Sequence, residues 1–136
     1  MSEEAFERFY WPHCKKLLLT LIERGMTPCM FFEGNCDAKL EYLLELPKGS
    51  MLVRLDRTDI FKAKEILGGH LCLEGNVPVS LLQMGSVQEV EDYCKKLIDV
   101  VGKGGGFVLS PRSSTHLAKP ENLKAMIDFT KEYGRY

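Results

Sequence analysis

The sequence predicts an α/β fold in which four parallel strands alternate with helices. Strand-like apolar runs begin near residues 28, 51, 70 and 106, and a helix-like pattern follows each of them. Helices between consecutive strands force parallel pairing through right-handed crossovers. The triplet Glu-Gly-Asn also recurs after the first and third runs, which places similar chemistry at the same end of two strands.

A helical segment, residues 1–26, precedes the first strand. Ser2 followed by two glutamates is typical of a helix start, because acids suit the positive end of the helix dipole. Pro12 is expected to end or kink this helix. A second helix begins there and ends at Gly25 in a left-handed conformation. Its apolar residues have the spacing of a buried face and are Cys14, Leu17, Leu18, Leu21 and Ile22.

The first two strand–helix units follow. Residues 28–32 form a short strand, and its continuous apolar run indicates that both faces are covered. Asp37 is expected to cap a helix that a proline stops. The second strand spans residues 51–56 and ends on a carboxylate. Asp59 caps the helix after it, and a pair of glycines ends that helix.

The third strand is predicted at residues 70–73, with Glu74, Gly75 and Asn76 in the turn that follows. Pro78 is well placed to open a short helix, because a first-turn residue needs no hydrogen-bonded N–H. This helix is expected to run through Met84.

The last unit begins with Ser-Val-Gln-Glu at 86–89, the pattern of a capping box. The glycine-rich segment 102–106 ends the long helix and leads into a strand at 107–110. It does not match a phosphate-binding P-loop, because there the glycines lie between a strand and the following helix. A final helix opens at 119–122 and ends near Gly134.

Composition excludes several functional classes. The 136 residues suit one domain, with 45% apolar and 27% charged residues and a net charge of −1. No basic block suggests nucleic-acid binding, and no apolar run is long enough to span a membrane. The acidic start lacks a secretory signal, and the five cysteines form no Cys-x-x-Cys pair. We therefore expect a cytoplasmic protein with reduced thiols.

Polar residues at the ends of the strands are the first candidates for a site. In parallel α/β folds chemistry gathers at the carboxyl ends of strands, so Glu33, Asp56, Glu74 and Ser110 are expected on one rim. Glu33 and Asp56 are candidates for catalysis or metal binding, and Glu33 stands out because four apolar residues precede it. Both acids have an alternative role as turn or helix-cap residues. Candidate substrate-binding residues on this rim are Gly34, Asn35, Gly75 and Asn76.

The loop 110–116 after the last strand adds two candidates. Arg112 could bind a carboxylate or phosphate, with Ser113 beside it, although a solvated loop arginine is an equal alternative. His70 and Cys72 share a strand face at a spacing that can bind zinc. A histidine at a helix end beside a packed cysteine is the commoner arrangement.

Several segments together resemble the C-terminal half of the uroporphyrinogen decarboxylase superfamily, which also contains cobalamin-dependent methyltransferases. They are PCMFFEGNC, IFKAKEILGG, CLEGNVP, MGSVQEVEDYCKKLI and KPENLKAMIDFTKEYG. The resemblance covers nearly the whole chain. It implies half of a (β/α)8 barrel, with a tetrapyrrole or corrinoid approaching the carboxyl-terminal rim.

The chain also departs from this superfamily. Its zinc-dependent methyltransferases carry His-x-Cys-Gly where this chain has Phe31, Phe32, Glu33 and Gly34, so Glu33 replaces a metal-binding cysteine. Ser113 or a neighbour replaces a later cysteine. The decarboxylase carries a histidine where this chain has Arg112 or Ser113, and its other key groups come from the N-terminal half.

The resemblance implies corrinoid-dependent methyl transfer, to or from a cobalamin carrier protein. In that reaction Glu33 would be a metal ligand, with zinc as the candidate metal, or a general base. Asn76 would anchor the substrate and Arg112 would clamp an anion. Decarboxylation of a tetrapyrrole carboxylate is the alternative, and a non-catalytic half-barrel binding module is a third.

Four strands leave two unpaired edges, so we expect a second copy or an N-terminal half-barrel to complete the fold. The chain alone is then expected to be inactive.

Overall fold

The computed structural model describes residues 1–135, which form one four-stranded sheet. All neighbouring strands are parallel and follow sequence order, β1-β2-β3-β4. The predicted fold class is therefore confirmed. The strands are β1 (Cys29–Phe32), β2 (Leu52–Leu55), β3 (Cys72–Val77) and β4 (Phe107–Pro111).

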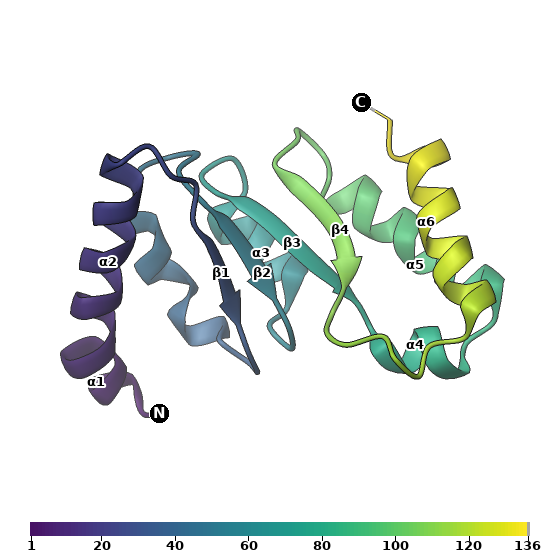
Figure 1. The fold of residues 1–136 in the computed structure, drawn as a ribbon, viewed down its shortest axis with the longest axis horizontal. Coiled ribbons are helices and arrows are strands. Elements are labelled where there is room, and N and C mark those ends of the chain that lie inside the picture. The colour runs from purple at the N-terminus through teal and green to yellow at the C-terminus, as the bar shows by residue number, and fades with distance from the viewer. Residues whose placement is uncertain (136) are drawn as a thin grey trace.

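Helices connect the strands and flank the sheet at both ends (Figure 1). The N-terminal helical segment lies beside β1, and the last helix lies at the far end beside α5. The helices are α1 (Glu3–Ala5), the π-helical η1 (Phe6–Tyr10), α2 (Trp11–Glu23), the 3₁₀-helical η2 (Asp37–Glu45), α3 (Ile60–Leu67), α4 (Val79–Met84), α5 (Val87–Val100) and α6 (Pro120–Tyr133).

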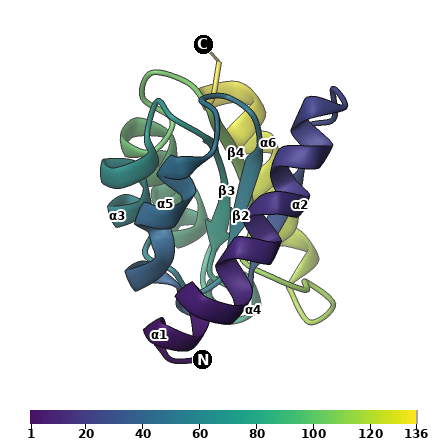
Figure 2. The ribbon, with the colours of Figure 1, turned by 90° about the vertical axis from the view of Figure 1, so that its left-hand side faces the viewer.

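Helices α3 and α5 cover one face of the sheet, and α2 and α6 lie beside its two ends (Figure 1). Alternate strand residues such as Val53, Leu55 and Leu73 are buried against α3 and α5, and both helices lie on the same side of the strands (Figure 2). On the other face Cys29 is exposed and the Phe31 side chain is 45% exposed. We call this side the open face. The prediction that β1 is covered on both faces was wrong for this chain, because no helix among residues 1–135 packs on the open face.

Pro12 does not end the first helix. Helical backbone runs from Glu3 to Glu23, and the turn before the proline widens into the π-helical segment Phe6–Tyr10. Pro12 then lies in the first turn of α2, where a missing N–H leaves no bond unmade. Of the two expected effects of Pro12, an end or a kink, the helix shows no end but does show a local distortion directly before the proline.

Strand β3 extends four residues past its predicted end, which corrects the turn expected at Glu74–Asn76. Pairing with β4 continues through Gly75–Leu109 to Val77–Pro111. The longer pairing places Glu74 in the middle of the sheet, opposite Val108, and not on the rim. Local sequence signals a turn at Gly-Asn, but the ladder to β4 overrides it.

Most helix ends follow their predicted caps. The side chain of Asp59 accepts bonds from the first turn of α3, and Ser86 with Glu89 forms the capping box of α5. Gly25 ends α2 with a φ of +78°. Asp37 is the exception, because its carboxylate does not cap its own helix: Oδ1 accepts the Asp59 N–H at 2.9 Å. It thereby ties η2 to α3.

Burial predicts how one cysteine behaves. Cys94 is fully buried in α5, and desolvation raises the pKa of its thiol to about 12. The thiol is therefore protonated at pH 8, and we expect it to resist alkylation until the protein unfolds. Mass spectrometry after iodoacetamide treatment, with and without denaturant, checks this. Alkylation of Cys94 at the same rate in both conditions would contradict it.

Candidate functional site

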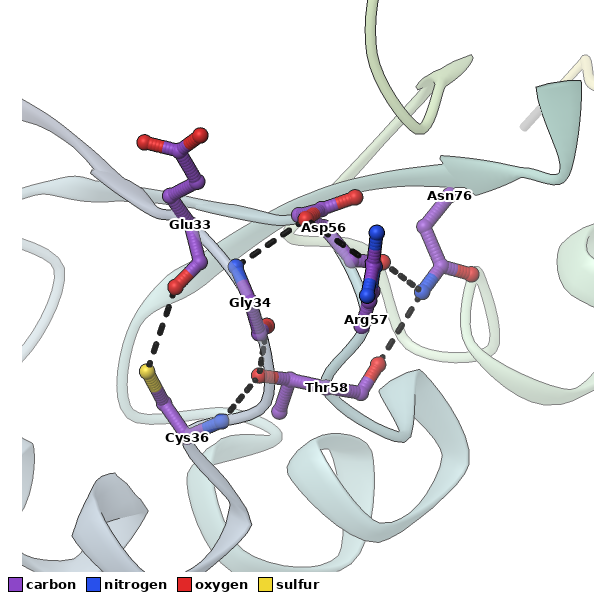
Figure 3. A network of polar contacts seen from close by, with 7 residues as sticks. All are labelled: Glu33, Gly34, Cys36, Asp56, Arg57, Thr58 and Asn76. Atoms are coloured by element: carbon purple, nitrogen blue, oxygen red, sulfur yellow. Dashed lines mark hydrogen bonds and ion pairs between the residues drawn. The ribbon is translucent and has the colours of Figure 1, made fainter.

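The carboxyl ends of β1, β2 and β3 are joined by a polar network (Figure 3). The Gly34 N–H donates to Asp56 Oδ2 at 3.0 Å. Asn76 Nδ2 donates to the carbonyls of Asp56 and Thr58 at 3.3 and 3.1 Å. The Cys36 N–H donates to Thr58 Oγ1 at 2.9 Å. These bonds hold the three loops in one arrangement at the rim.

Asp56 and Asn76 are therefore built into the rim itself. The Asp56 side chain is 12% exposed, with Arg57 Nε at 4.0 Å from its Oδ2. Asn76 is 2% exposed, and both of its amide hydrogens are directed at carbonyls. Their observed contacts support the backbone and leave Asn76 Oδ1 without a partner.

Two of the candidate glycines serve the same network. Gly34 has a φ of +80°, which places its N–H on Asp56. Gly75 has a φ of +140°, and a side chain there would meet the Leu55 carbonyl oxygen at 3.1 Å. Asn35 is exposed and bonds only to its neighbour Asp37, through both its amide group and its oxygen.

The Glu33 backbone carbonyl accepts a bond from Cys36 Sγ at 3.9 Å, but its side chain lies at the rim outside this network (Figure 3). Its side chain is exposed and points away from Asp56 and Thr58 (Figure 3). It lines a shallow pocket of about 240 Å³ between β1 and the N-terminal helix, with Phe6, Tyr10 and Cys36 among its walls. Burial raises the pKa of the Cys36 thiol, so this neighbour is a protonated thiol at neutral pH.

Sequence reasoning missed Arg54, which lies at the centre of the open face. Its Nε is 3.5 Å from Glu74 Oε1, and its guanidinium lies over the Phe31 ring at 5.3 Å. Phe31, Arg54 and Glu74 are in register across three strands. The sequence did contain one signal for Arg54: it is a lone charge inside the apolar run Met-Leu-Val-Arg-Leu. Such a charge indicates a side chain that does not face the hydrophobic core.

Arg54 borders the largest hollow at the rim, which we call the mouth pocket. It holds about 590 Å³ between the open face and the loop after β4. His116 Nδ1 and Ser114 Oγ are 2.8 Å apart in this loop. The pocket is lined by Phe31, Arg54, Pro111, Ser113, Ser114, Thr115 and His116.

The structure separates candidates that the sequence placed together. Ser113 lines the mouth pocket, whereas Arg112, one residue earlier, lines a different pocket with Asn76. The chain bends at these two residues, directly after β4, and the loop therefore lines two pockets.

The residues present do not form the zinc site of the related methyltransferases. Among residues 1–135, no group of three His, Cys, Asp or Glu side chains is arranged to hold a metal ion. Glu33 is one ligand, whereas zinc requires three or four. The His70–Cys72 pair is not assembled either, because His70 Nε2 lies 2.8 Å from the Leu46 carbonyl and the residue precedes β3.

Comparison with known proteins decides the family. The family model for uroporphyrinogen decarboxylase (URO-D) matches residues 1–133. The chain belongs to the URO-D family. It is 28% identical to the uroporphyrinogen decarboxylase of Chlorobium phaeovibrioides over 97% of its length, and 26% identical to that of Syntrophotalea carbinolica over 94%. It spans 38% and 37% of those proteins.

A solved structure shows the same fold. A methyltransferase from Methanosarcina mazei superposes with a TM-score of 0.78, at 21% identity, over 99% of this chain and 39% of the methyltransferase. The URO-D chain therefore has the fold of half a (β/α)8 barrel. In a closed barrel the open face lines the interior, and the mouth pocket lies at the carboxyl-terminal end. No helix among residues 1–135 is long and apolar enough to cross a membrane.

Proposed function

We propose that the open face and the mouth pocket form one half of a tetrapyrrole-binding site, and that the complete barrel decarboxylates a tetrapyrrole carboxylate. One observation carries this proposal: the guanidinium of Arg54, stacked on Phe31, borders a pocket otherwise lined by hydroxyl groups and His116. A cation, an aromatic surface and several hydrogen-bonding groups suit a flat ring that bears carboxylates.

Arg54 would hold the ring through a carboxylate that does not react. Its ion pair with Glu74 and the Phe31 ring beneath it hold the guanidinium over the open face. A guanidinium bound to the reacting carboxylate would stabilise the ground state and slow the loss of CO₂. The arginine therefore contributes orientation of the substrate, and the reacting group lies elsewhere in the mouth.

No three His, Cys, Asp or Glu side chains among residues 1–135 could hold a metal ion together, and this supports decarboxylation over the metal-assisted reaction that sequence resemblance implied. Decarboxylation on this scaffold requires positioned charges. Zinc-dependent methyl transfer requires ligands that these residues do not bring together.

Corrinoid-dependent methyl transfer is the second candidate, and Glu33 favours it. Its carboxylate is exposed on the rim, free of protein hydrogen bonds, at the position of a metal-binding cysteine in related methyltransferases. A ligand set that uses Glu33 would need groups from a partner half-barrel. Metal analysis of the purified natural protein tests this, with about one zinc per chain expected for methyl transfer.

The unpaired edges of β1 and β4 favour pairing with a second half-barrel, either a second copy or an N-terminal half. Pairing would also cover the exposed apolar side chains of Phe31 and Val108. Molar mass in solution distinguishes a paired assembly from a monomer.

The decarboxylase proposal predicts a specific defect for Arg54→Gln in the full-length natural protein. We expect KM for uroporphyrinogen to rise about 10- to 100-fold, because a charge-assisted hydrogen bond contributes about 1.5–3 kcal/mol, with a smaller change in kcat. Chromatography of the products by number of carboxylates measures turnover.

Arg24→Gln is the matched control, since Arg24 is exposed at the end of α2 and far from the mouth pocket in sequence and fold. Equal kinetics for both variants would remove Arg54 from the substrate site. Turnover of methylcobalamin without decarboxylation would support the second candidate, and neither activity would indicate a binding module.

A further inference from the structure

A second pocket lies behind the rim, among the ends of β3 and β4 and the beginning of α3. It holds about 310 Å³ and opens on the helix-covered side of the sheet, away from the residues of the mouth pocket. We call it the outer pocket. Its polar lining is formed by Arg57, Thr58, Asp59, Asn76, Tyr93 and Arg112.

Two buried polar atoms of this lining have no hydrogen-bond partner: Asn76 Oδ1 and Arg112 Nε. Asn76 is 2% exposed, and its Nδ2 donates to two carbonyls. Its side-chain oxygen is therefore the acceptor that lacks a partner. A buried acceptor and a buried charged donor are each costly when unpaired. Both are explained if a ligand that accepts and donates hydrogen bonds occupies the outer pocket.

Arg112 is a cation of the outer pocket that no carboxylate among residues 1–135 contacts, although the Asp59 carboxylate of the same lining keeps its negative charge. Arg57 lies 4.0 Å from Asp56, and the Asp59 carboxylate accepts the N–H groups of Phe61 and Lys62 at the start of α3. Arg112 forms no ion pair with any residue between 1 and 135. The guanidinium of Arg112 is therefore available to bind an anion.

Tyr93 adds a neutral hydroxyl to the wall. Tyr93 and Arg112 line the same pocket. Burial raises the pKa of Tyr93, and the positive charge of Arg112 opposes that shift. The phenol is protonated at neutral pH and can donate a hydrogen bond.

We propose that the outer pocket binds a hydrogen phosphate group. The anionic oxygens would accept bonds from Arg112 and Tyr93, and the P–OH group would donate to Asn76 Oδ1. Sulfate has the same shape but carries no proton at neutral pH, so it leaves the asparagine oxygen unpaired.

The experiment is isothermal titration of the full-length natural protein at pH 7 with inorganic phosphate, sulfate and ribose 5-phosphate. We expect phosphate to bind at least about tenfold more tightly than sulfate, the penalty for one unpaired buried acceptor. Tighter binding of ribose 5-phosphate than of inorganic phosphate would identify a phosphate ester as the ligand, and the reverse would identify the free ion.

Variants locate the site and separate it from the mouth pocket. Arg112→Gln is expected to weaken phosphate binding at least about tenfold, whereas Arg54→Gln leaves it unchanged. Should Arg112→Gln fail to fold by circular dichroism, Tyr93→Phe is expected to weaken phosphate binding several-fold.

Equal affinity for phosphate and sulfate, no phosphate binding, or loss of binding in Arg54→Gln would each overturn the proposal. None of these outcomes depends on decarboxylase activity, so this proposal and the proposed function fail independently.

Discussion

Trp11→Ala is expected to lower the free energy of unfolding by about 3–5 kcal/mol, the usual cost of removing a large buried ring. Trp11 is 4% exposed and packs against Phe6 and Tyr42, with ring centroids 6.1 and 5.8 Å apart. Its Nε1–H donates to Glu45 Oε2 at 3.2 Å. The variant loses both the packing and the hydrogen bond that join α2 to η2.

Chemical denaturation followed by far-UV circular dichroism measures this effect, because Trp11 is the single tryptophan and fluorescence is lost with it. Trp11→Phe is the control: it keeps an aromatic ring against Phe6 and removes only the N–H. We expect Trp11→Phe to lower the free energy of unfolding by less than half as much as Trp11→Ala does. A loss below about 1 kcal/mol for Trp11→Ala would show that the N-terminal helix is not part of the cooperative core.

Asn76→Ala is expected to cost about 2–5 kcal/mol. The substitution removes two buried hydrogen bonds and leaves the carbonyls of Asp56 and Thr58 unsatisfied, at about 1–3 kcal/mol each. Because these carbonyls belong to the loop after β2, the loss is expected to loosen the rim itself.

Asn35→Ala is the matched control, since Asn35 is exposed and contacts only Asp37. We expect it to change stability by less than about 1 kcal/mol. Urea denaturation of both variants at one temperature makes the comparison. Equal losses of stability in Asn76→Ala and Asn35→Ala would mean that water replaces the Asn76 amide at the two carbonyls without cost.

Local signals predicted most of the fold. Asp59 and the Ser86–Glu89 pair cap their helices as expected, and Gly25 ends α2, because caps depend on residues within one turn. The strand–helix alternation likewise required parallel pairing. These features involve neighbours in sequence, so the sequence contains the relevant interactions.

The errors arose where distant residues compete with local preference. The turn expected at Glu74–Asn76 is strand, because β4 lies alongside and pairs with it. At His70 and Cys72, where the spacing allowed a zinc pair but favoured a helix-end histidine, the His70 ring contacts the Leu46 carbonyl. Neither partner could be inferred from spacing within β3.

The candidate site shows the same division. Sequence placed Glu33, Asp56 and Arg112 directly after strands, and they follow β1, β2 and β4, whereas Asn76, expected in a turn, lies inside β3. It missed Arg54, whose importance comes from Phe31 and Glu74 on the two neighbouring strands. A lone arginine in a strand acquires a role only when the strands on both sides are known.

The sequence by itself determined the order of the elements, their caps and the end of the sheet where polar residues gather, since each follows from contacts a few residues apart. Only the tertiary structure decided which side of the sheet each polar residue faces. Ser113 and Arg112 are adjacent, yet one lines the mouth pocket and the other the outer pocket. That assignment depends on strand pairing and on where α3 and α5 pack, which join residues far apart in the chain.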